Sequence, residues 1–203
     1  MARRISVIPM SDTADAITPG DVSPTALPDA FLSSDLAASA RGFSLPRYRD
    51  IPDMPLYRDQ VTTYIGGIFE ALDACGEGPW ITPSMVNNYV KAGLVPSPLR
   101  KQYTREHVAR LIVVCAFKQF LPMDAIRHLF EIQRMTYPVA MSYDYVATEL
   151  ENRLREAFSQ DLRIPDSASH VTRESLLVRG AASAFAAKAY LMSYLAFSGL
   201  EQH

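Results

Sequence analysis

The segment 80–120, WITPSMVNNYVKAGLVPSPLRKQYTREHVARLIVVCAFKQF, constrains the fold most, because it holds signals for two helices joined by a basic turn. Thr82 followed by Pro83 indicates a helix start, since a hydroxyl caps free N–H groups and proline fits the first helical position. Gly93 indicates the end of that helix, and a proline three residues later prevents its continuation. Residues 82–92 are therefore predicted to form a short helix.

One face of this helix is polar, because Ser84, Asn87, Asn88 and Lys91 fall at i, i+3, i+4 and i+7 and share a stripe. An asparagine can bond adenine through N6 and N7, and a lysine can bond guanine or a phosphate. The stripe therefore has the groups that reading base edges requires. The alternative is an ordinary solvated face, which most amphipathic helices have.

The segment 96–103 follows, with two prolines, the adjacent cations Arg100 and Lys101, and a tyrosine. It predicts a small two-stranded wing whose basic tip faces a phosphate backbone. Thr104 then indicates the cap of a longer helix with apolar residues at buried spacing. Helix, basic wing and helix together are the layout of a winged helix-turn-helix.

Two runs, MVNNYVKAGLV at 85–95 and KQYTREHVARL at 101–111, resemble the DNA-binding domain of MerR-type regulators. More closely, residues 56–132 resemble an uncharacterised group of bacterial proteins that is catalogued as a domain of unknown function and thought to be MerR-like. The resemblance implies a recognition helix at 82–92 in the major groove and a wing at 96–103 on the backbone. The DNA-binding residues expected from the pattern and the resemblance are Ser84, Asn87, Asn88, Lys91, Arg100, Lys101, Tyr103 and Arg105.

The charge of the whole chain does not indicate a nucleic-acid partner, since 203 residues carry a net charge of −2. The charge of residues 80–120 does, because six cations stand there against the single acid Glu106, and phosphate binding depends on the local field. The two cysteines are far apart in the sequence. They predict reduced thiols and a cytoplasmic protein.

Composition and proline positions predict three parts. Residues 1–40 are expected to be a mobile tail with a short helix near 30–40, since large apolar residues are few there. Residues 41–137 are expected to form the winged domain, whose first helix spans 56–72. Residues 138–203 are expected to form a C-terminal helical region, in which the first helix carries its charges mostly on faces other than its apolar face.

The last predicted helix, 174–200, is rich in alanine and apolar nearly all round. We expect it to be buried between two subunits, with Ala181, Ala184 and Ala187 permitting close approach. A membrane span is disfavoured, because Lys188 lies mid-run and no basic anchors flank it. An effector pocket in this region is left open, and the aromatic residues considered for its lining are Tyr143, Tyr145, Phe158, Phe185 and Tyr190.

These features predict a mostly α protein that acts as a dimeric bacterial transcription regulator on double-stranded DNA. The alternative is a non-enzymatic protein-interaction module on a winged-helix scaffold. No enzyme is expected, because the sequence lacks a Gly-rich phosphate loop, paired acids and a nucleophile with a base. No cofactor or metal is expected either, since Asp124 and His128 at i, i+4 indicate an ion pair without a third ligand.

Overall fold

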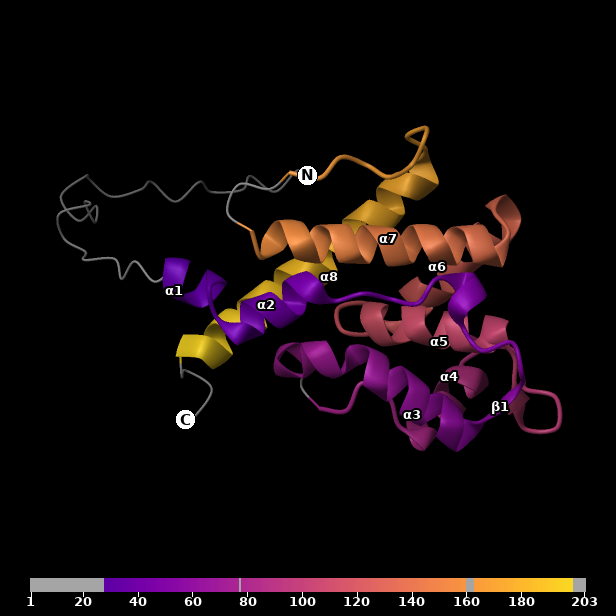
Figure 1. Ribbon diagram of the computed structural model, residues 1–203. Helices are drawn as coiled ribbons and strands as arrows, with labels where there is room; N and C mark the ends of the chain where they lie inside the picture. Colours follow the sequence, from indigo (N-terminus) through magenta and orange to yellow (C-terminus); the bar gives the residue numbers. More distant parts are fainter. Residues whose placement is uncertain (1–27, 77, 160–162, 199–203) are drawn as a thin grey trace, which may run out of the picture.

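The computed structural model describes residues 28–76, 78–159 and 163–198, and most of them are helical (Figure 1). The helices are α1 (Pro28–Leu32), α2 (Asp35–Gly42), α3 (Arg58–Phe69), α4 (Pro83–Lys91), α5 (Arg105–Phe117), α6 (Met123–Thr136), α7 (Val139–Ala157) and α8 (Arg173–Ser198). The other described elements are the 3₁₀ segments η2 (Tyr48–Asp50) and η3 (Glu70–Cys75) and the strands β1 (Leu56–Tyr57) and β2 (Gln102–Tyr103). The mostly α class is confirmed.

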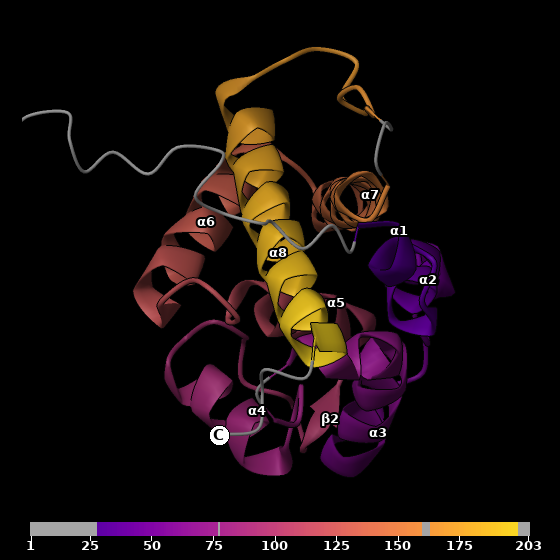
Figure 2. The ribbon, with the colours of Figure 1, turned by 90° about the vertical axis from the view of Figure 1, so that its left-hand side faces the viewer.

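Helix α5 lies between two groups of elements. Figure 1 shows α7 on one side of it, and α3, α4 and the small sheet on the other. In Figure 2, α8 runs along the front of the molecule, with α6 on one side and α7 seen end-on at the other. From Val108 to Phe117, each residue of α5 apart from Arg110 is buried. Since each large apolar side chain contributes about 1.5–3 kcal/mol on burial, α5 anchors both groups.

The two-stranded sheet differs from the wing that the sequence predicted. Strand β2 pairs antiparallel with β1, which places Leu56 opposite Tyr103. The partner strand therefore comes from ahead of α3, and pairing within 96–103 is limited to an isolated antiparallel bridge between Leu99 and Gln102. Leu56 was expected to begin the helix, but α3 begins at Arg58, after Tyr57 donates its N–H to Gln60 Oε1 (2.9 Å). A strand of two residues is too short to show an alternating pattern.

The predicted mobile tail is wrong for residues 28–40, where α1 and α2 pack on the body of the molecule. Phe31 is fully buried, and its ring lies 5.3 Å from the ring of Tyr190 and 5.4 Å from that of Tyr194. Ser34 caps α2 by accepting the N–H of Ala37. One large side chain thus anchors a segment whose average composition is that of a tail. The remainder of the predicted tail, 1–27, lies outside the described residues.

The charged residues of α7 were expected mostly on faces other than its apolar face, and those faces are covered at Glu149, Glu151 and Arg153, which are buried. The segment before η2 covers one side of α7, where Glu151 accepts hydrogen bonds from the Leu45 N–H (2.8 Å) and from Arg47. The loop before α8 covers another side. Each buried charge is paired, as burial of an ion requires.

Helix α8 packs along α7 and η3 of its own chain. Its small residues are divided between two faces: Ala181 and Ala182 are buried, whereas Ala184 and Ala187 are exposed. Among the described residues, no helix combines the length and the apolar character that crossing a membrane would need. One cluster of buried apolar residues joins the N-terminal, central and C-terminal elements.

Candidate nucleic-acid interface

Helix α4 is bounded by the local signals that predicted it. Thr82 accepts the N–H of Met85 at 3.2 Å, and Pro83 occupies the first helical position. At the other end Gly93 has a φ of +73°, the Leu94 N–H donates to the Tyr89 carbonyl (3.0 Å), and the Gly93 N–H donates to that of Val90. This is a Schellman motif, which fixes the length of the helix.

The inner side of α4 is held from two directions. Val86 and Tyr89 are buried, and burial raises the pKa of the Tyr89 hydroxyl to about 12. From α6, Arg127 donates its Nε–H to the Ala92 carbonyl at 3.2 Å. The helix is therefore fixed in orientation, which a rigid reader of a groove requires.

The outer side of α4 carries the predicted stripe. Ser84, Asn87, Asn88 and Lys91 are all exposed and lie on one helix face. None of the four side chains has a hydrogen bond or ion pair with another described residue. Their polar groups are thus available to a partner.

The most unusual backbone follows α4, in the loop that projects beside β1 (Figure 1). Arg100 and Lys101 have φ values of 51° and 62° and are the described non-glycine residues with positive φ. They form the two central residues of a tight turn, closed by the Gln102 N–H donating to the Leu99 carbonyl (2.9 Å). Positive φ at both positions is the pattern of a type I′ turn, which favours Asn-Gly.

Both cations at this turn are exposed and have no ion-pair partner among the described residues. A left-handed backbone costs an ordinary residue roughly 1–2 kcal/mol. Strain of this kind persists where the surrounding structure imposes it, and it is concentrated at functional sites. The turn therefore presents two positive charges in a conformation that another sequence would adopt more easily.

Tyr103 and Arg105 differ from the other predicted DNA-binding residues, because both are engaged within the chain. Tyr103 is 4% exposed and belongs to β2, so its ring is part of the core. Arg105 donates its Nε–H to the Ile51 carbonyl (2.9 Å), pairs with Asp53 at 3.4 Å and lies over the ring of Tyr48. Tyr103 therefore packs in the core, and Arg105 is engaged by the segment before β1, whereas phosphate contacts were expected for both.

His107 is a supporting residue to which the sequence analysis assigned no role. Its Nδ1 accepts the Thr104 N–H at 3.1 Å and closes a capping box at the start of α5. The neutral imidazole then carries its proton on Nε2. Burial lowers the pKa of His107, so the ring favours the neutral form that this box needs. The sequence signal was a Thr-x-x-His spacing in place of the usual Thr-x-x-Glu.

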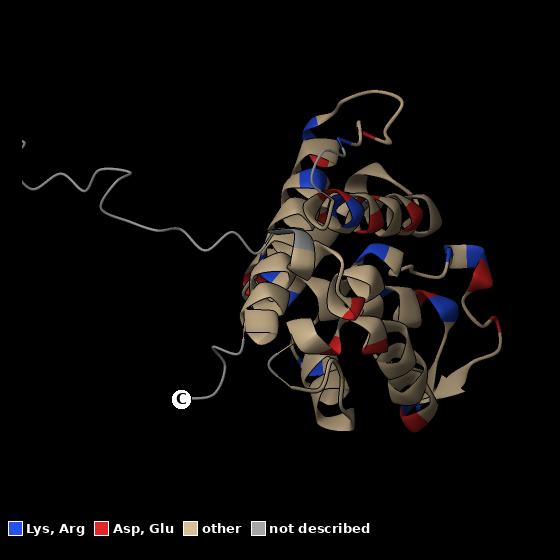
Figure 3. Cartoon of the chain, turned by 60° about the vertical axis from the view of Figure 1, so that its left-hand side comes forward, with Lys and Arg blue, Asp and Glu red and all other residues tan. Residues whose placement is uncertain are grey.

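The local charge excess is smaller in the fold than in the sequence. Arg110 pairs with Glu106 at 3.1 Å and Arg105 with Asp53, which leaves Lys91, Arg100 and Lys101 as the exposed cations near α4 and the turn. Figure 3 shows Lys and Arg interspersed with Asp and Glu over the visible fold, so no broad region of one sign stands out. Any phosphate contact would therefore be local.

The described residues contain no group of three or more His, Cys, Asp and Glu side chains that could hold a metal ion. Cys75 and Cys115 are free and buried, and burial raises the pKa of each thiol.

Of the aromatic residues considered for an effector pocket, Tyr143 and Tyr145 line a cavity between α5, α6, α7 and the start of α8. Phe158 and Phe185 belong to the core instead.

Comparison with known families gives one match. Residues 46–146 match the model of a family described as Domain of unknown function (DUF1836). The match agrees with the resemblance of residues 56–132 to a domain group of unknown function, and it carries no link to MerR-type regulators. No curated protein and no solved structure matches the chain.

Proposed function

We propose that this protein is a cytoplasmic bacterial transcription regulator that binds double-stranded DNA as a dimer through a MerR-like winged helix-turn-helix. The observation that carries the proposal is the Arg100–Lys101 turn, where two unpaired cations are held exposed in a strained backbone. Such a turn is suited to contact with DNA phosphates, because it presents two cations on a short rigid hairpin.

Helix α4 supplies the second half of the proposal. Its exposed stripe consists of two amides, a hydroxyl and a lysine, which are side chains that bond base edges in the major groove. We assign base reading to Asn87, Asn88 and Lys91, with Ser84 at the start of the helix, and phosphate contact to Arg100 and Lys101. Tyr103 is buried and Arg105 is engaged within the chain, so we assign neither residue a contact with DNA.

The dimer is proposed to form through the outer face of α8. Leu177, Gly180, Ala184, Ala187 and Leu191 follow each other at spacings of three and four and are all exposed. This spacing gives a continuous apolar seam with small residues at its centre, which lets two helices approach closely. Sedimentation analysis tests it: Leu191→Lys is expected to give a monomer, whereas Met135→Lys, on the exposed side of α6, is expected to leave a dimer.

The alternative, a protein-interaction module on the same scaffold, is favoured by one observation. Two of the six cations of residues 80–120 are paired within the chain, which leaves a weaker field than a typical DNA-binding face has. A protein partner would use the amide-rich face of α4 without needing the cations of the turn. The two functions therefore differ in their dependence on Lys101.

Fluorescence anisotropy with a duplex from the region upstream of its own gene, at two salt concentrations, tests the proposal. We expect specific binding over a scrambled duplex. Lys101→Ala is expected to reduce the slope of log affinity against log salt by about 0.9, which is the loss of one phosphate contact. Asn88→Ala is expected to reduce the preference for the specific duplex by about 1–3 kcal/mol.

Arg134→Ala is the matched control, because Arg134 is an exposed cation on α6 outside the proposed interface. It is expected to leave both quantities unchanged. Absence of binding to either duplex at low salt would overturn the DNA-binding proposal. An equal effect of Lys101→Ala and Arg134→Ala would do the same for the assigned interface.

A further inference from the structure

A concave cavity of about 490 Å³ lies between α5, α6, α7 and the start of α8. It is separate from the proposed DNA-binding residues, none of which line it. Small-molecule sites in proteins have volumes of roughly 300–1,000 Å³. The cavity therefore has the size of a site for a small organic molecule.

The walls of the cavity are apolar, with contributions from each surrounding element. Val113 and Phe117 come from α5, Phe130 from α6, Tyr143 and Val146 from α7, and Val178 from α8. Several of these side chains are buried in the core on their other side, so the walls are fixed by packing. An apolar occupant would gain about 25 cal/mol for each Å² of apolar surface that it removes from water.

Most polar groups of the deeper walls already have partners, whereas the side chains of Ser169, His170 and the half-exposed Glu174 have no hydrogen bond or ion pair among the described residues. The Tyr143 hydroxyl donates to the Pro46 carbonyl at 2.9 Å, and the Tyr145 hydroxyl donates to Asp166 at 2.9 Å. Burial raises the pKa of both tyrosines, so neither provides an anion. Arg110 pairs with Glu106 and lies over the ring of Phe130 at 5.2 Å. An anionic occupant would find no unpaired Arg or Lys in the lining, and a cationic one would find only the half-exposed Glu174, so a charge on the buried part of a ligand would remain unpaired, which is costly away from water.

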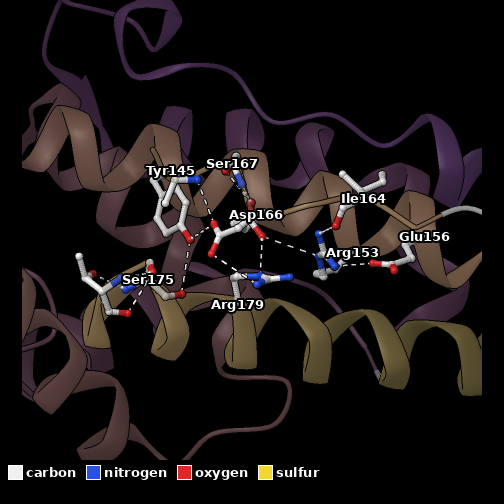
Figure 4. A network of polar contacts seen from close by, with 11 residues as sticks. Tyr145, Arg153, Glu156, Ile164, Asp166, Ser167, Ser175 and Arg179 are labelled. Atoms are coloured by element: carbon white, nitrogen blue, oxygen red, sulfur yellow. Dashed lines mark hydrogen bonds and ion pairs between the residues drawn. The ribbon is translucent and has the colours of Figure 1, made fainter. Parts of the chain in front are cut away.

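One wall is made by the loop before α8 and is held by ion pairs (Figure 4). Asp166 accepts the Tyr145 hydroxyl and the Ala168 N–H and pairs with Arg179 at 3.4 Å. Arg179 in turn faces the buried Glu149. These contacts hold the loop against α7 and α8, and residues directly after Asp166 line the cavity. The cavity is therefore preformed, which reduces the ordering cost of binding.

From these features we infer that the cavity is a binding site for a compact, uncharged, hydrophobic organic molecule. The inference rests on the cavity alone, and it stands or falls independently of DNA binding. The polar side chains without a partner come from the loop before α8 and from its first turn, where Ser169 and His170 are exposed and Glu174 is half-exposed. A single hydroxyl or carbonyl on the ligand would face them, and the rest of the ligand would contact the apolar walls.

The test uses N-phenyl-1-naphthylamine, a neutral dye whose fluorescence rises in apolar surroundings, with the full chain. We expect saturable binding of one dye per chain. Three competitors of matched size then report the charge preference: 1-naphthylmethanol is neutral, 1-naphthylmethylamine is cationic and 1-naphthoate is anionic at pH 7. The neutral competitor is expected to displace the dye at a concentration at least tenfold lower than either ion.

Two variants and one control locate the site. Met141→Trp narrows the opening, because Met141 lines the cavity and is 59% exposed, and Val113→Phe fills the interior. Both are expected to weaken dye binding at least tenfold. Met135→Trp is the matched control, since Met135 is also an exposed methionine but does not line the cavity. It is expected to bind the dye as the unmodified chain does.

Urea unfolding of each variant shows whether the fold is kept, and Met141→Trp, at an exposed position, keeps the test valid if Val113→Phe does not fold. The inference is overturned by an absence of saturable dye binding, or by equal displacement by the three competitors. It is also overturned if Met141→Trp and Met135→Trp bind the dye equally. Loss of dye binding as the chain dimerises at higher concentration would assign the cavity to a second copy of the chain instead.

Discussion

Replacing the strained turn by the sequence that a type I′ turn prefers should stabilise the fold and weaken DNA binding at the same time. The change is Arg100→Asn together with Lys101→Gly, because Asn-Gly is the favoured pair for two central residues of positive φ. Relief of two left-handed residues is worth roughly 1 kcal/mol each at the lower limit. The glycine loses about 0.5–1 kcal/mol of this through the entropy of the unfolded chain.

The net gain is thus about 1 kcal/mol, which corresponds to a rise of roughly 2–4 °C in Tm for a chain of this length. Removal of both cations takes away up to two phosphate contacts and should reduce the salt slope by about 1.8. The factor by which DNA affinity falls between 50 and 200 mM salt would then be roughly tenfold smaller for the variant than for the unmodified chain. Urea unfolding and fluorescence anisotropy measure the two effects on the same preparation.

The matched control is Arg100→Ala with Lys101→Ala, which removes the same charges but keeps ordinary residues at the two positive-φ positions. It should weaken DNA binding as much as the Asn-Gly variant and give no stabilisation. An Asn-Gly variant that is no more stable than the control would refute the reasoning on strain. Unchanged DNA affinity in both variants would refute the placement of the turn on DNA.

Three further predictions concern the support of the fold. Glu149→Ala should lower the free energy of unfolding by about 3 kcal/mol in urea, because it removes an ion-pair partner of the buried Arg153. The control Glu131→Ala should change the free energy of unfolding by less than about 0.5 kcal/mol. Phe31→Ala should cost about 3–5 kcal/mol in the same assay, since its ring is fully buried; a cost below about 1 kcal/mol would contradict the anchoring of α1. Because the pKa of His107 is lowered by folding, the unfolded chain binds more protons than the folded chain as the pH drops below 6.5. Tm should therefore fall below that pH. His107→Gln, which keeps the capping box, should reduce this fall.

Local signals explain why both ends of α4 and the start of α5 could be predicted from the sequence. Thr82, Gly93 and Thr104 act on backbone groups within a few residues of themselves, so their effect is readable without the rest of the fold. The exposed stripe of α4 was predictable for the same reason, because helical spacing alone places its residues on one face.

Contacts between distant parts of the chain explain what the sequence could not reveal. The pairing of Leu56 with Tyr103 joins segments that are separated by α3 and α4, and neither strand is long enough to show a recognisable sequence pattern. The burial of Glu149 depends on the loop before α8, and on Arg179, which is thirty residues away along the chain. The burial of a charged helix face can be recognised only when the segments that cover it are known.

The positions of α5 and the cavity lead to a last prediction, which requires both proposals to hold. Helix α5 begins directly after β2 and Thr104, so three residues join it to the Arg100–Lys101 turn, while Val113 and Phe117 on the same helix line the cavity. A ligand that shifts α5 would therefore shift the proposed DNA contacts. Linkage requires that the effect be reciprocal, whatever its sign.

We expect the neutral dye, at saturation, to change the affinity for the upstream duplex by roughly 5–150-fold, the usual range of such coupling. The duplex must then change the affinity for the dye by the same factor, and both factors are measurable by anisotropy and by dye fluorescence. Met141→Trp should remove the effect of the dye and leave the affinity for the duplex itself unchanged. An effect of the dye that persists in Met141→Trp would show that the dye acts on DNA binding from a place other than the cavity. No coupling, with both ligands bound, would show that α5 does not connect the two sites.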